Sequence, residues 1–320
     1  MKFNKKNLKK IKGDASFRSF YRKRNNKKKT VIVYSSKEKE KNLLIYDAIN
    51  KLLIRNKILA PKLFNENYNK NFIEIEDFGD ITLFKLLKKR KQNQLKLLKD
   101  VIDLLKKIQK IKQSKIKNFK GNYYKIPKYS KKELFKEAKL FCNWYVTKFL
   151  TKTKASKLNS LLNEEIKFLL SKVKLKNNVF VHRDFHVSNL MKYKNKIAII
   201  DSQDALIGNK AYDLASLIDD VRFQTSLEFK NKIFNYYQNL NKRNINNHYL
   251  KNDFEILSVL RNMKIIGIFT RLAKRDNKKD YLKLIPYAWK LIEIRTKKNN
   301  IFKKLKILLD INFPKKIRNY

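Results

Sequence analysis

The sequence has 320 residues, of which 43% are hydrophobic and 12% aromatic. This content is enough for a sizeable buried core and excludes a wholly disordered chain. The single cysteine, Cys142, excludes an intrachain disulfide bond and fits a reducing compartment. No stretch approaches the roughly 18 uninterrupted apolar residues of a transmembrane helix, so we expect a cytoplasmic protein without a membrane-spanning segment.

The net charge is +50, from 78 Lys and Arg against 28 Asp and Glu. Such a charge suits a protein that binds nucleic acid or an anionic membrane, but a nucleic-acid site gathers its basic residues on one element or face. Here they are spread from Lys2 to Lys316, in a chain rich in Lys, Asn and Ile with only 5 Gly and 4 Pro. Composition bias explains the charge better, and we expect no specific nucleic-acid partner.

The first eighty residues are predicted to form a small β-rich lobe with one helix. Short stretches of β-branched and aromatic residues favour strands, and apolar residues at helical spacing favour a helix between them. The predicted strands are 16–22, 30–34, 62–64 and 71–75, and the predicted helix is 37–51. A turn or hinge is expected at 76–80.

After Gly79 the pattern changes to long amphipathic helices. The predicted helices are 95–108, 132–150, 155–173, 212–223, 228–240, 254–273, 281–296 and a basic last helix at 301–316, and the predicted strands are 179–181 and 197–200. For the last helix, packing on the rest of the protein is favoured over contact with a membrane. The sequence therefore predicts an α+β, bilobal fold, with a β-rich N-lobe at residues 1–79 and a mainly helical C-lobe at residues 80–320.

The stretch from His182 to Asp220 is unusually rich in aspartate for so basic a chain. It contains no glutamate, and its aspartates are Asp184, Asp201, Asp204, Asp213, Asp219 and Asp220. A solvated acidic face is the alternative, but such a face usually mixes both acids. The stretch therefore suggests a cation site.

Two short apolar strands in this region flank a polar loop. Asp184 and Asn189 lie in the loop, and Asp201 ends the second strand. Phosphoryl transfer needs an acceptor for the proton of the substrate hydroxyl and oxygen ligands for the Mg²⁺ that neutralises the nucleotide phosphates. We predict Asp184 as the proton acceptor and Asn189 and Asp201 as Mg²⁺ ligands, with ATP as the phosphoryl donor.

The spacing His-x-Asp-x-x-x-x-Asn that begins at His182, followed by Asp201 twelve residues after Asn189, resembles the aminoglycoside phosphotransferase and choline kinase-like branch of the protein-kinase-like fold. The run YDLA at 212–215 agrees with it. The resemblance implies a small-molecule kinase in which Asp213 supports the catalytic loop. For His182, a structural hydrogen-bonding role in the loop is favoured over proton transfer.

Further segments resemble bacterial sugar kinases of cell-wall recycling, which phosphorylate N-acetylmuramate and N-acetylglucosamine at the anomeric hydroxyl. The segments are GDASFR at 13–18, EDFGD at 76–80, NWY at 143–145 and DSQDA at 201–205. This resemblance implies an amino sugar as the small-molecule substrate.

The same resemblance implies roles for the remaining candidate site residues. They are Ser16, Phe17 and Arg18 in a turn over the nucleotide phosphates, Glu76, Asp77 and Phe78 at the adenine through backbone groups, and Trp144, Tyr145, Gln203 and Asp204 near the acceptor. Aromatic residues in helices are usually buried, so core packing is an open alternative for Trp144 and Tyr145.

One feature departs from protein kinases, which carry a Lys on the third strand to hold the α- and β-phosphates. The corresponding run TVIVY at 30–34 contains none. Arg18 or Arg22 is the predicted replacement. A weakened catalytic site is the alternative, but the presence of Asp184, Asn189 and Asp201 argues against it.

Two other functions compete with a sugar kinase. A kinase of choline or of an aminoglycoside has the same motifs, but a polycationic aminoglycoside needs a site lined with carboxylates. A chain with 78 basic and 28 acidic residues is a poor host for it. A nucleic-acid-binding or scaffold protein on a kinase fold is the second rival, and it would show no Mg²⁺-dependent response to ATP.

Overall fold

The computed structural model describes residues 8–11, 18–23, 29–35, 42–89, 93–243 and 245–319. The chain forms two compact units: unit 1 contains Met1–Pro127 and His182–Ile207, and unit 2 contains Lys128–Val181 and Gly208–Tyr320. Unit 1 thus holds the predicted catalytic loop as well as the N-terminal strands. Compact units need not coincide with functional lobes, so the predicted lobe boundary after residue 79 stays a prediction.

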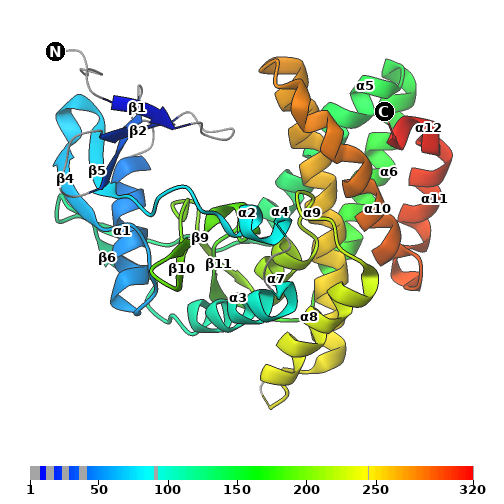
Figure 1. Cartoon of the computed structure of the whole chain (residues 1–320). Coiled ribbons are helices and arrows are strands. Elements are labelled where there is room, and N and C mark those ends of the chain that lie inside the picture. Colours follow the sequence, from blue (N-terminus) through cyan, green and yellow to red (C-terminus); the bar gives the residue numbers. More distant parts are fainter. Residues whose placement is uncertain are drawn as a thin grey trace. The chain divides into compact units, whose positions relative to one another are not determined.

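The N-terminal part of unit 1 is an antiparallel sheet. Its strands within the described residues are β1 (Leu8–Ile11), β2 (Arg18–Lys23), β3 (Thr30–Ser35), β4 (Leu63–Asn67) and β5 (Phe72–Glu76). They are ordered β1-β2-β3-β5-β4, with α1 (Asn42–Arg55) beside the sheet (Figure 1). The register pairs Arg22 with Val31 and Val31 with Ile75, so alternate residues of neighbouring strands face α1 together.

Apolar residues from the sheet and from α1 form the core of this part. The cluster consists of Val31, Val33, Leu43, Tyr46, Ile73 and Ile75, all of them buried. The apolar positions of α1 recur at helical spacing, which gives this helix one buried face against the sheet. This packing fixes α1 against β3 and β5.

The rest of unit 1 contains further helices and strands and a second, small apolar cluster. They are η1 (Tyr68–Lys70), α2 (Leu83–Lys88), α3 (Gln94–Gln109), β6 (Lys115–Lys117), β7 (Tyr123–Lys125), η3 (Val187–Asn189), β9 (Leu190–Tyr193) and β10 (Lys196–Ile199). The cluster contains Phe78, Met191 and Ala198. Strands β9 and β10 form an antiparallel hairpin whose turn residues Lys194 and Asn195 have φ of 45° and 59°.

Unit 2 is mainly helical. Its elements are α4 (Lys131–Ala138), the π-helical turn η2 (Phe141–Val146), α5 (Thr147–Phe149), α6 (Lys152–Ser171), β8 (Asn177–Val181), α7 (Lys210–Ile218), α8 (Leu227–Leu240), α9 (Asn247–Arg275), η4 (Lys279–Leu284), α10 (Ile285–Thr296), η5 (Asn300–Phe302), α11 (Lys303–Asn312) and α12 (Lys315–Arg318). Strand β11 (Leu206–Asn209) leads into this unit along the chain. The long helix α9 packs against α4, α7, α10 and η2 (Figure 1).

A glycine permits the closest of these helix contacts. A Cβ atom placed on Gly267 of α9 would lie 2.3 Å from the carbonyl carbon of Leu140 and 2.5 Å from the amide nitrogen of Phe141. Because these are backbone atoms, they cannot move away by a change of rotamer. Only glycine lets α9 approach the start of η2 this closely.

We therefore expect Gly267→Ala to destabilise unit 2. In an exposed helix the same change stabilises by about 1 kcal/mol, but here overpacking should lower the free energy of unfolding by about 1–3 kcal/mol or more. Urea unfolding followed by circular dichroism measures this, with Lys274→Ala on an exposed turn of α9 as control. A Gly267→Ala protein at least as stable as wild type would contradict the close contact.

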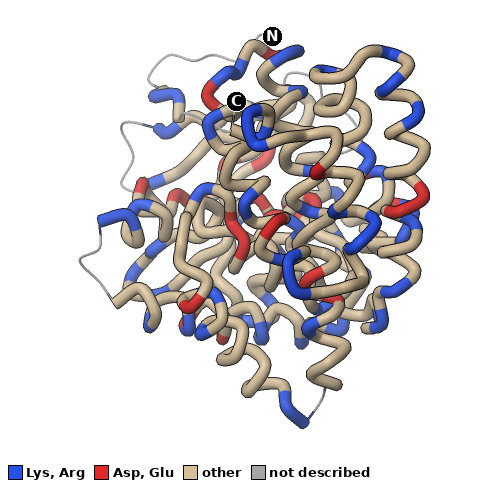
Figure 2. The backbone as a smooth tube through the Cα atoms, turned by 90° about the vertical axis from the view of Figure 1, so that its right-hand side faces the viewer, with Lys and Arg blue, Asp and Glu red and all other residues tan. Residues whose placement is uncertain are grey.

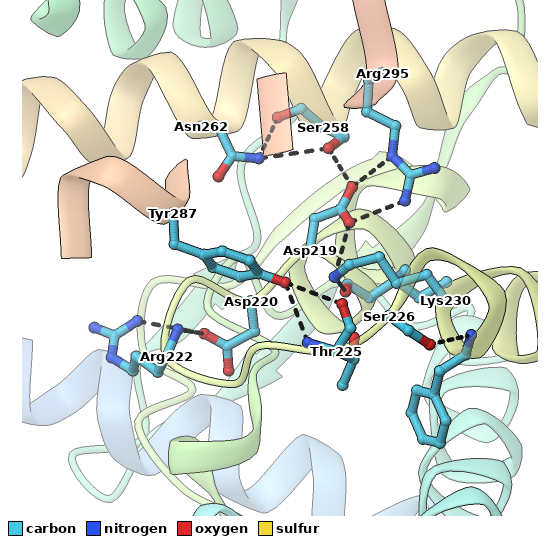
Figure 3. A network of polar contacts seen from close by, with 12 residues as sticks. Asp219, Asp220, Arg222, Thr225, Ser226, Lys230, Ser258, Asn262, Tyr287 and Arg295 are labelled. Atoms are coloured by element: carbon cyan, nitrogen blue, oxygen red, sulfur yellow. Dashed lines mark hydrogen bonds and ion pairs between the residues drawn. The ribbon is translucent and has the colours of Figure 1, made fainter. Parts of the chain in front are cut away.

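A buried network of charges joins several helices of unit 2 (Figure 3). The carboxylate of Asp219, which is 0% exposed, accepts hydrogen bonds from Arg295 Nε at 2.8 Å and Nη2 at 2.9 Å. Ser258 Oγ donates to it at 2.5 Å, and Lys230 Nζ lies 3.3 Å away. Asp219 thus connects the end of α7 to α8, α9 and α10.

This network changes the interpretation of part of the aspartate-rich stretch. Asp219 and Asp220 are 0% and 1% exposed, so neither lies on a solvated acidic face. Asp220 Oδ1 accepts a hydrogen bond from the backbone nitrogen of Arg222 at 2.9 Å. Asp219 joins helices of unit 2, whereas the contacts of Asp220 are with the nearby Arg222. The suggestion of a cation site does not extend to Asp219, whose charge is met by Arg295 and Lys230.

The α+β fold class predicted from the sequence is confirmed by the antiparallel sheet in the N-terminal part and the helices that follow it. The predicted helix 132–150 was wrong as one continuous helix, because the π-helical turn η2 interrupts it. After Gly79 only the strands 179–181 and 197–200 were predicted, so strands β6, β7, β9 and β11 were missed. Among the described residues, no helix is long and apolar enough to span a membrane.

Candidate functional site

The β9–β10 hairpin of unit 1 brings Asn189 and Asp201 to the same end. Leu190 of β9 pairs with Ile199 of β10, and the backbone nitrogen of Ile200 donates to the carbonyl oxygen of Asn189 at 3.1 Å. Asn189 directly precedes β9, and Asp201 directly follows Ile200. The hairpin register alone therefore places these two predicted metal ligands beside each other at its open end.

The loop before the hairpin holds Asp184 next to Asn189. The backbone oxygen of Asp184 accepts hydrogen bonds from Asn189 Nδ2 and from the backbone nitrogen of His186, both at 3.0 Å. The loop is thus held by the Asp184 backbone, and its carboxylate is not used in these two bonds. His186 itself is only 5% exposed, and its Nε2 lies 3.5 Å from Asn189 Nδ2.

His182 lies at the base of this loop. Its ring is 1% exposed, and Nε2 donates to the carbonyl oxygen of Ile200 at 3.1 Å. The ring also makes an edge contact with Phe185, with centroids 6.1 Å apart. This bond links the start of the loop to the residue before Asp201, in keeping with the structural role proposed for His182.

Two residues of the site have left-handed backbone conformations. Arg183 has φ of 76° and Asp201 has φ of 63°. Residues with a Cβ atom adopt this region rarely, at a cost of about 1–3 kcal/mol, and such residues concentrate at functional sites. Arg183, with this unfavourable conformation, directly precedes Asp184, and Asp201 has the conformation itself. This supports a functional interpretation of Asp184 and Asp201.

The electrostatic surroundings of Asp201 combine one cation with other carboxylates. Partial burial raises the pKa of the Asp201 carboxyl, the charge of Arg18 opposes this change, and the charge of Asp184 raises the pKa further. Arg18 Nη2 lies 2.8 Å from Asp201 Oδ1. The Arg18 side chain is only 4% exposed, whereas that of Asp201 is 39% exposed. Asp201 therefore presents part of its carboxylate to solvent while a buried guanidinium neutralises it.

The donor atoms of Asn189 and Asp201 fit Mg²⁺. The Nδ2 atom of Asn189 is bound to the Asp184 backbone, which leaves the Asn189 amide oxygen as the ligand atom. This amide oxygen and the carboxylate oxygens of Asp201 are hard donors of the type Mg²⁺ prefers. Within the residues that the structure describes, no three His, Cys, Asp or Glu side chains gather as a metal site. Two protein ligands suit an ion that keeps waters and binds nucleotide phosphates.

The hinge residues are held mainly by the protein itself. The backbone nitrogens of Glu76 and Asp77 donate to the carbonyl oxygens of Lys62 at 2.9 Å and Lys29 at 3.2 Å. These two amides are therefore used within the chain and are not free for adenine. Phe78 is 7% exposed, and its ring packs on Tyr193 with centroids 4.8 Å apart.

The carboxylate of Asp77 organises the turn of this hinge. Its Oδ1 atom accepts hydrogen bonds from the Gly79 backbone nitrogen at 2.8 Å and from Arg22 Nη2 at 3.0 Å. Arg22 Nη1 also donates to Asp80 at 2.8 Å. Hydrogen bonding to Asp77 and then to Asp80 raises the pKa of Arg22, and the bond from Arg22 lowers the pKa of Asp80. Arg22 is thus a residue that stabilises the hinge.

The candidate acceptor residues separate into two groups. In unit 1, Gln203 is buried and its Nε2 donates to Asp204 Oδ2 at 2.6 Å, while Asp204 is exposed. Burial raises the pKa of Tyr124, and the nearby charge of Asp204 adds to this effect. Gln203 and Asp204 are therefore bonded to each other within unit 1.

In unit 2, Tyr145 is a core residue. It is 1% exposed, its hydroxyl accepts a hydrogen bond from Trp289 Nε1 at 3.0 Å, and its ring stacks on Phe141 with centroids 5.2 Å apart. This is the core-packing alternative, and burial raises the pKa of Tyr145 to about 12. Trp144 is only partly buried. Asp213 is 0% exposed on α7 of the same unit.

Ser16 and Phe17, predicted to cover the phosphates, lie outside the described residues. A contact that sequence reasoning missed is the hydrogen bond from Ser202 Oγ to Asn50 Oδ1 at 2.8 Å. It ties the residue after Asp201 to α1, although 152 positions separate the two. No local pattern identifies such a pair.

Comparison with known proteins shows similarity to phosphotransferases and kinases. Residues 7–246 match the model of the phosphotransferase enzyme family. A relative from Neisseria meningitidis, named N-acetylmuramate/N-acetylglucosamine kinase, is 28% identical over 280 residues, which cover 85% of this chain and 80% of the relative. A relative of the same name from Pseudomonas putida is 27% identical over 278 residues, covering 85% of this chain and 78% of the relative.

A solved structure of an amicoumacin kinase with AMP-PNP, Ca²⁺ and amicoumacin is similar in fold. Its TM-score is 0.62 at 13% sequence identity, with 93% of this chain and 90% of that chain covered. At this identity the likeness shows the fold alone, and it confirms the predicted protein-kinase-like fold. The chain belongs to the phosphotransferase enzyme family and is a kinase of small molecules.

Proposed function

We propose that this kinase transfers the γ-phosphoryl group of ATP to the anomeric hydroxyl of N-acetylmuramate or N-acetylglucosamine. The observation that carries the catalytic part is the geometry of the hairpin end, where Asn189 and Asp201 lie together and Asp184 is bonded to Asn189 through its backbone. The choice of sugar rests on the two relatives, whose names specify these two acceptors. The matched residues cover most of the length of each relative.

Each residue of the hairpin end has a distinct proposed role. Asp184 accepts the proton of the acceptor hydroxyl, and because an anomeric hydroxyl is more acidic than other sugar hydroxyls, a carboxylate suffices as the base. Asn189 and Asp201 would hold Mg²⁺, which neutralises charge on the nucleotide phosphates when it is bound. Gln203, Asp204 and Trp144 are the proposed acceptor contacts, and Asp213 is the proposed support of the loop.

Charge favours this acceptor over a polycation. The chain has 78 basic and 28 acidic residues, and Figure 2 shows Lys and Arg at many places along the backbone. N-acetylmuramate carries a carboxylate that Lys or Arg can pair with, whereas an aminoglycoside requires carboxylates in the site. Basic residues that are spread along the sequence differ from the cluster on one element that a nucleic-acid site shows.

An acceptor panel tests the proposal. The protein is incubated with ATP, Mg²⁺ and one of N-acetylmuramate, N-acetylglucosamine, their methyl 1-glycosides, choline or an aminoglycoside, and ADP release is followed. We expect turnover with the free sugars and none with the glycosides, whose anomeric oxygen is blocked. Activity on choline or on an aminoglycoside alone would still show a small-molecule kinase but would contradict the proposed sugar acceptor. The absence of a Mg²⁺-dependent thermal shift with ATP would instead favour a nucleic-acid-binding or scaffold protein on a kinase fold.

Asp201→Ala tests the proposed metal ligand. We expect a higher Mg²⁺ requirement and a weaker affinity for Mg-ATP, in addition to a lower rate. Loss of a residue that only supports a metal ligand costs roughly tenfold to a hundredfold, so loss of the ligand should cost at least as much. Titration of Mg²⁺ at fixed ATP measures it, and unchanged Mg-ATP binding would show that Asp201 holds no metal.

A further inference from the structure

Two arginines on one strand are the candidates to replace the lysine that β3 lacks. Arg18 and Arg22 lie four residues apart on β2, so their side chains leave the same face of the sheet at opposite ends of the strand. Arg18 pairs across the sheet with Ser35 and Arg22 with Val31. Their surroundings decide between them.

The charge of Arg22 is already neutralised by two hinge carboxylates, those of Asp77 and Asp80. Its guanidinium donates to Asp77 through Nη2 at 3.0 Å and to Asp80 through Nη1 at 2.8 Å. Two carboxylates hold one cation, and the Asp77 side chain is only 3% exposed. Moving Arg22 to a phosphate would leave a buried carboxylate without its cation, which is costly.

Arg18 is placed differently. Its carboxylate contact is Asp201, at 2.8 Å, and its guanidinium carbon lies 5.8 Å from the centre of the Phe20 ring and 5.7 Å from that of Tyr46. The Arg18 side chain is only 4% exposed, and it contacts the Asp201 side chain, which is 39% exposed. The planar guanidinium can bind two phosphate oxygens in a fixed bidentate geometry, whereas a lysine binds phosphate as a point charge.

We propose that Arg18 is the phosphate-binding cation of this kinase and that it exchanges partners when the nucleotide binds. Without nucleotide, Arg18 and Asp201 neutralise each other. When Mg-ATP binds, the Asp201 carboxylate would coordinate the metal and the Arg18 guanidinium would bind the phosphates, so that neither charge is left without a partner of opposite sign. This inference rests on the proposed function, because that function assigns Asp201 to Mg²⁺.

The first test measures nucleotide binding without turnover. Isothermal titration of ATP and of adenosine is carried out on wild type, Arg18→Gln, Arg22→Gln and Lys23→Gln. Lys23 is the matched control, since it lies on β2 but faces the other side, where it pairs with Glu74 at 2.7 Å. We expect Arg18→Gln to weaken ATP binding roughly tenfold to a hundredfold, as loss of charged hydrogen bonds does, and to leave adenosine binding unchanged.

The outcomes separate this inference from the proposed function. Wild-type protein that binds no ATP contradicts both. Wild type that binds ATP while Arg18→Gln binds it equally well overturns only the inference, as does a selective loss of ATP affinity in Arg22→Gln. If Arg18→Gln does not fold, Arg18→Lys keeps the charge without the guanidinium fork and should show a smaller but still ATP-selective loss. An equal loss for adenosine would mean a structural role.

The second test concerns the exchange itself and uses ATP with EDTA. Asp201→Asn releases Arg18 from its ion pair, so this variant should bind metal-free ATP several times more tightly than wild type. Removing a negative charge would also help ATP, and the double variant Arg18→Gln/Asp201→Asn separates the two causes. The gain should disappear in the Arg18→Gln background. A gain that persists there would show simple charge repulsion and overturn the exchange.

Discussion

Asp184→Asn should abolish turnover while ATP binding stays close to that of wild type. A positioned base contributes roughly a hundredfold to ten-thousandfold to the rate, and asparagine cannot accept the proton. The loop should keep its shape, because Asn189 and His186 bind the backbone oxygen of Asp184 and not its carboxylate. Steady-state rates and ATP titration measure the two effects separately.

The control for this variant is Asp100→Asn, which removes an exposed carboxylate of α3 in the same unit. It should leave both the rate and the ATP affinity unchanged. An Asp184→Asn protein that keeps more than about a tenth of the wild-type rate would remove Asp184 from the role of base.

Asp219→Ala should destabilise unit 2 more than any surface substitution. Removing one partner of a buried ion pair costs about 3–5 kcal/mol, and here it leaves the cations Arg295 and Lys230 without their carboxylate (Figure 3). Burial alone would raise the pKa of Asp219, but Arg295 and Lys230 outweigh it and lower the pKa to about 2. Because the pKa is lower in the folded protein, this stabilisation is present above about pH 4 and is lost as the pH falls toward 2.

A surface pair in the same unit provides the control. Asp276 accepts hydrogen bonds from Arg275 Nε at 2.7 Å and Nη2 at 3.0 Å, much as Asp219 does from Arg295. Because that pair is exposed to solvent, Asp276→Ala should change the stability little. Urea unfolding at pH 7 compares the two variants. Equal stabilities for Asp219→Ala and Asp276→Ala would show that burial of the network contributes nothing.

Residues close together in the sequence explain why the catalytic loop could be predicted. His182, Asp184, Asn189 and Asp201 belong to one loop and hairpin, and the local register decides their proximity. The ion pair of Arg18 with Asp201 joins residues 183 positions apart. Its partners were both predicted as site residues, but only the folded sheet identifies them as a pair.

Two errors in the predicted secondary structure have local causes. Strand β9 has only four residues, LMKY, too few to show an alternating pattern. The apolar spacing of 132–150 continues through η2, so periodicity does not reveal the π-helical turn. Tyr145 is an aromatic residue in a family-like segment, yet its neighbours Phe141, Trp289 and Phe313 bury it in the core. Trp289 and Phe313 lie far from Tyr145 in the sequence, so no local pattern identifies this packing.

The central claim is transfer to the anomeric oxygen, and phosphorus NMR of the purified product tests it most directly. Wild-type protein with ATP, Mg²⁺ and N-acetylmuramate or N-acetylglucosamine should give a phosphorus signal coupled to the anomeric proton. That signal should convert to inorganic phosphate in mild acid, because sugar 1-phosphates are acid-labile. A phosphate ester that survives the acid, or one coupled to any other sugar proton, would contradict the proposed reaction.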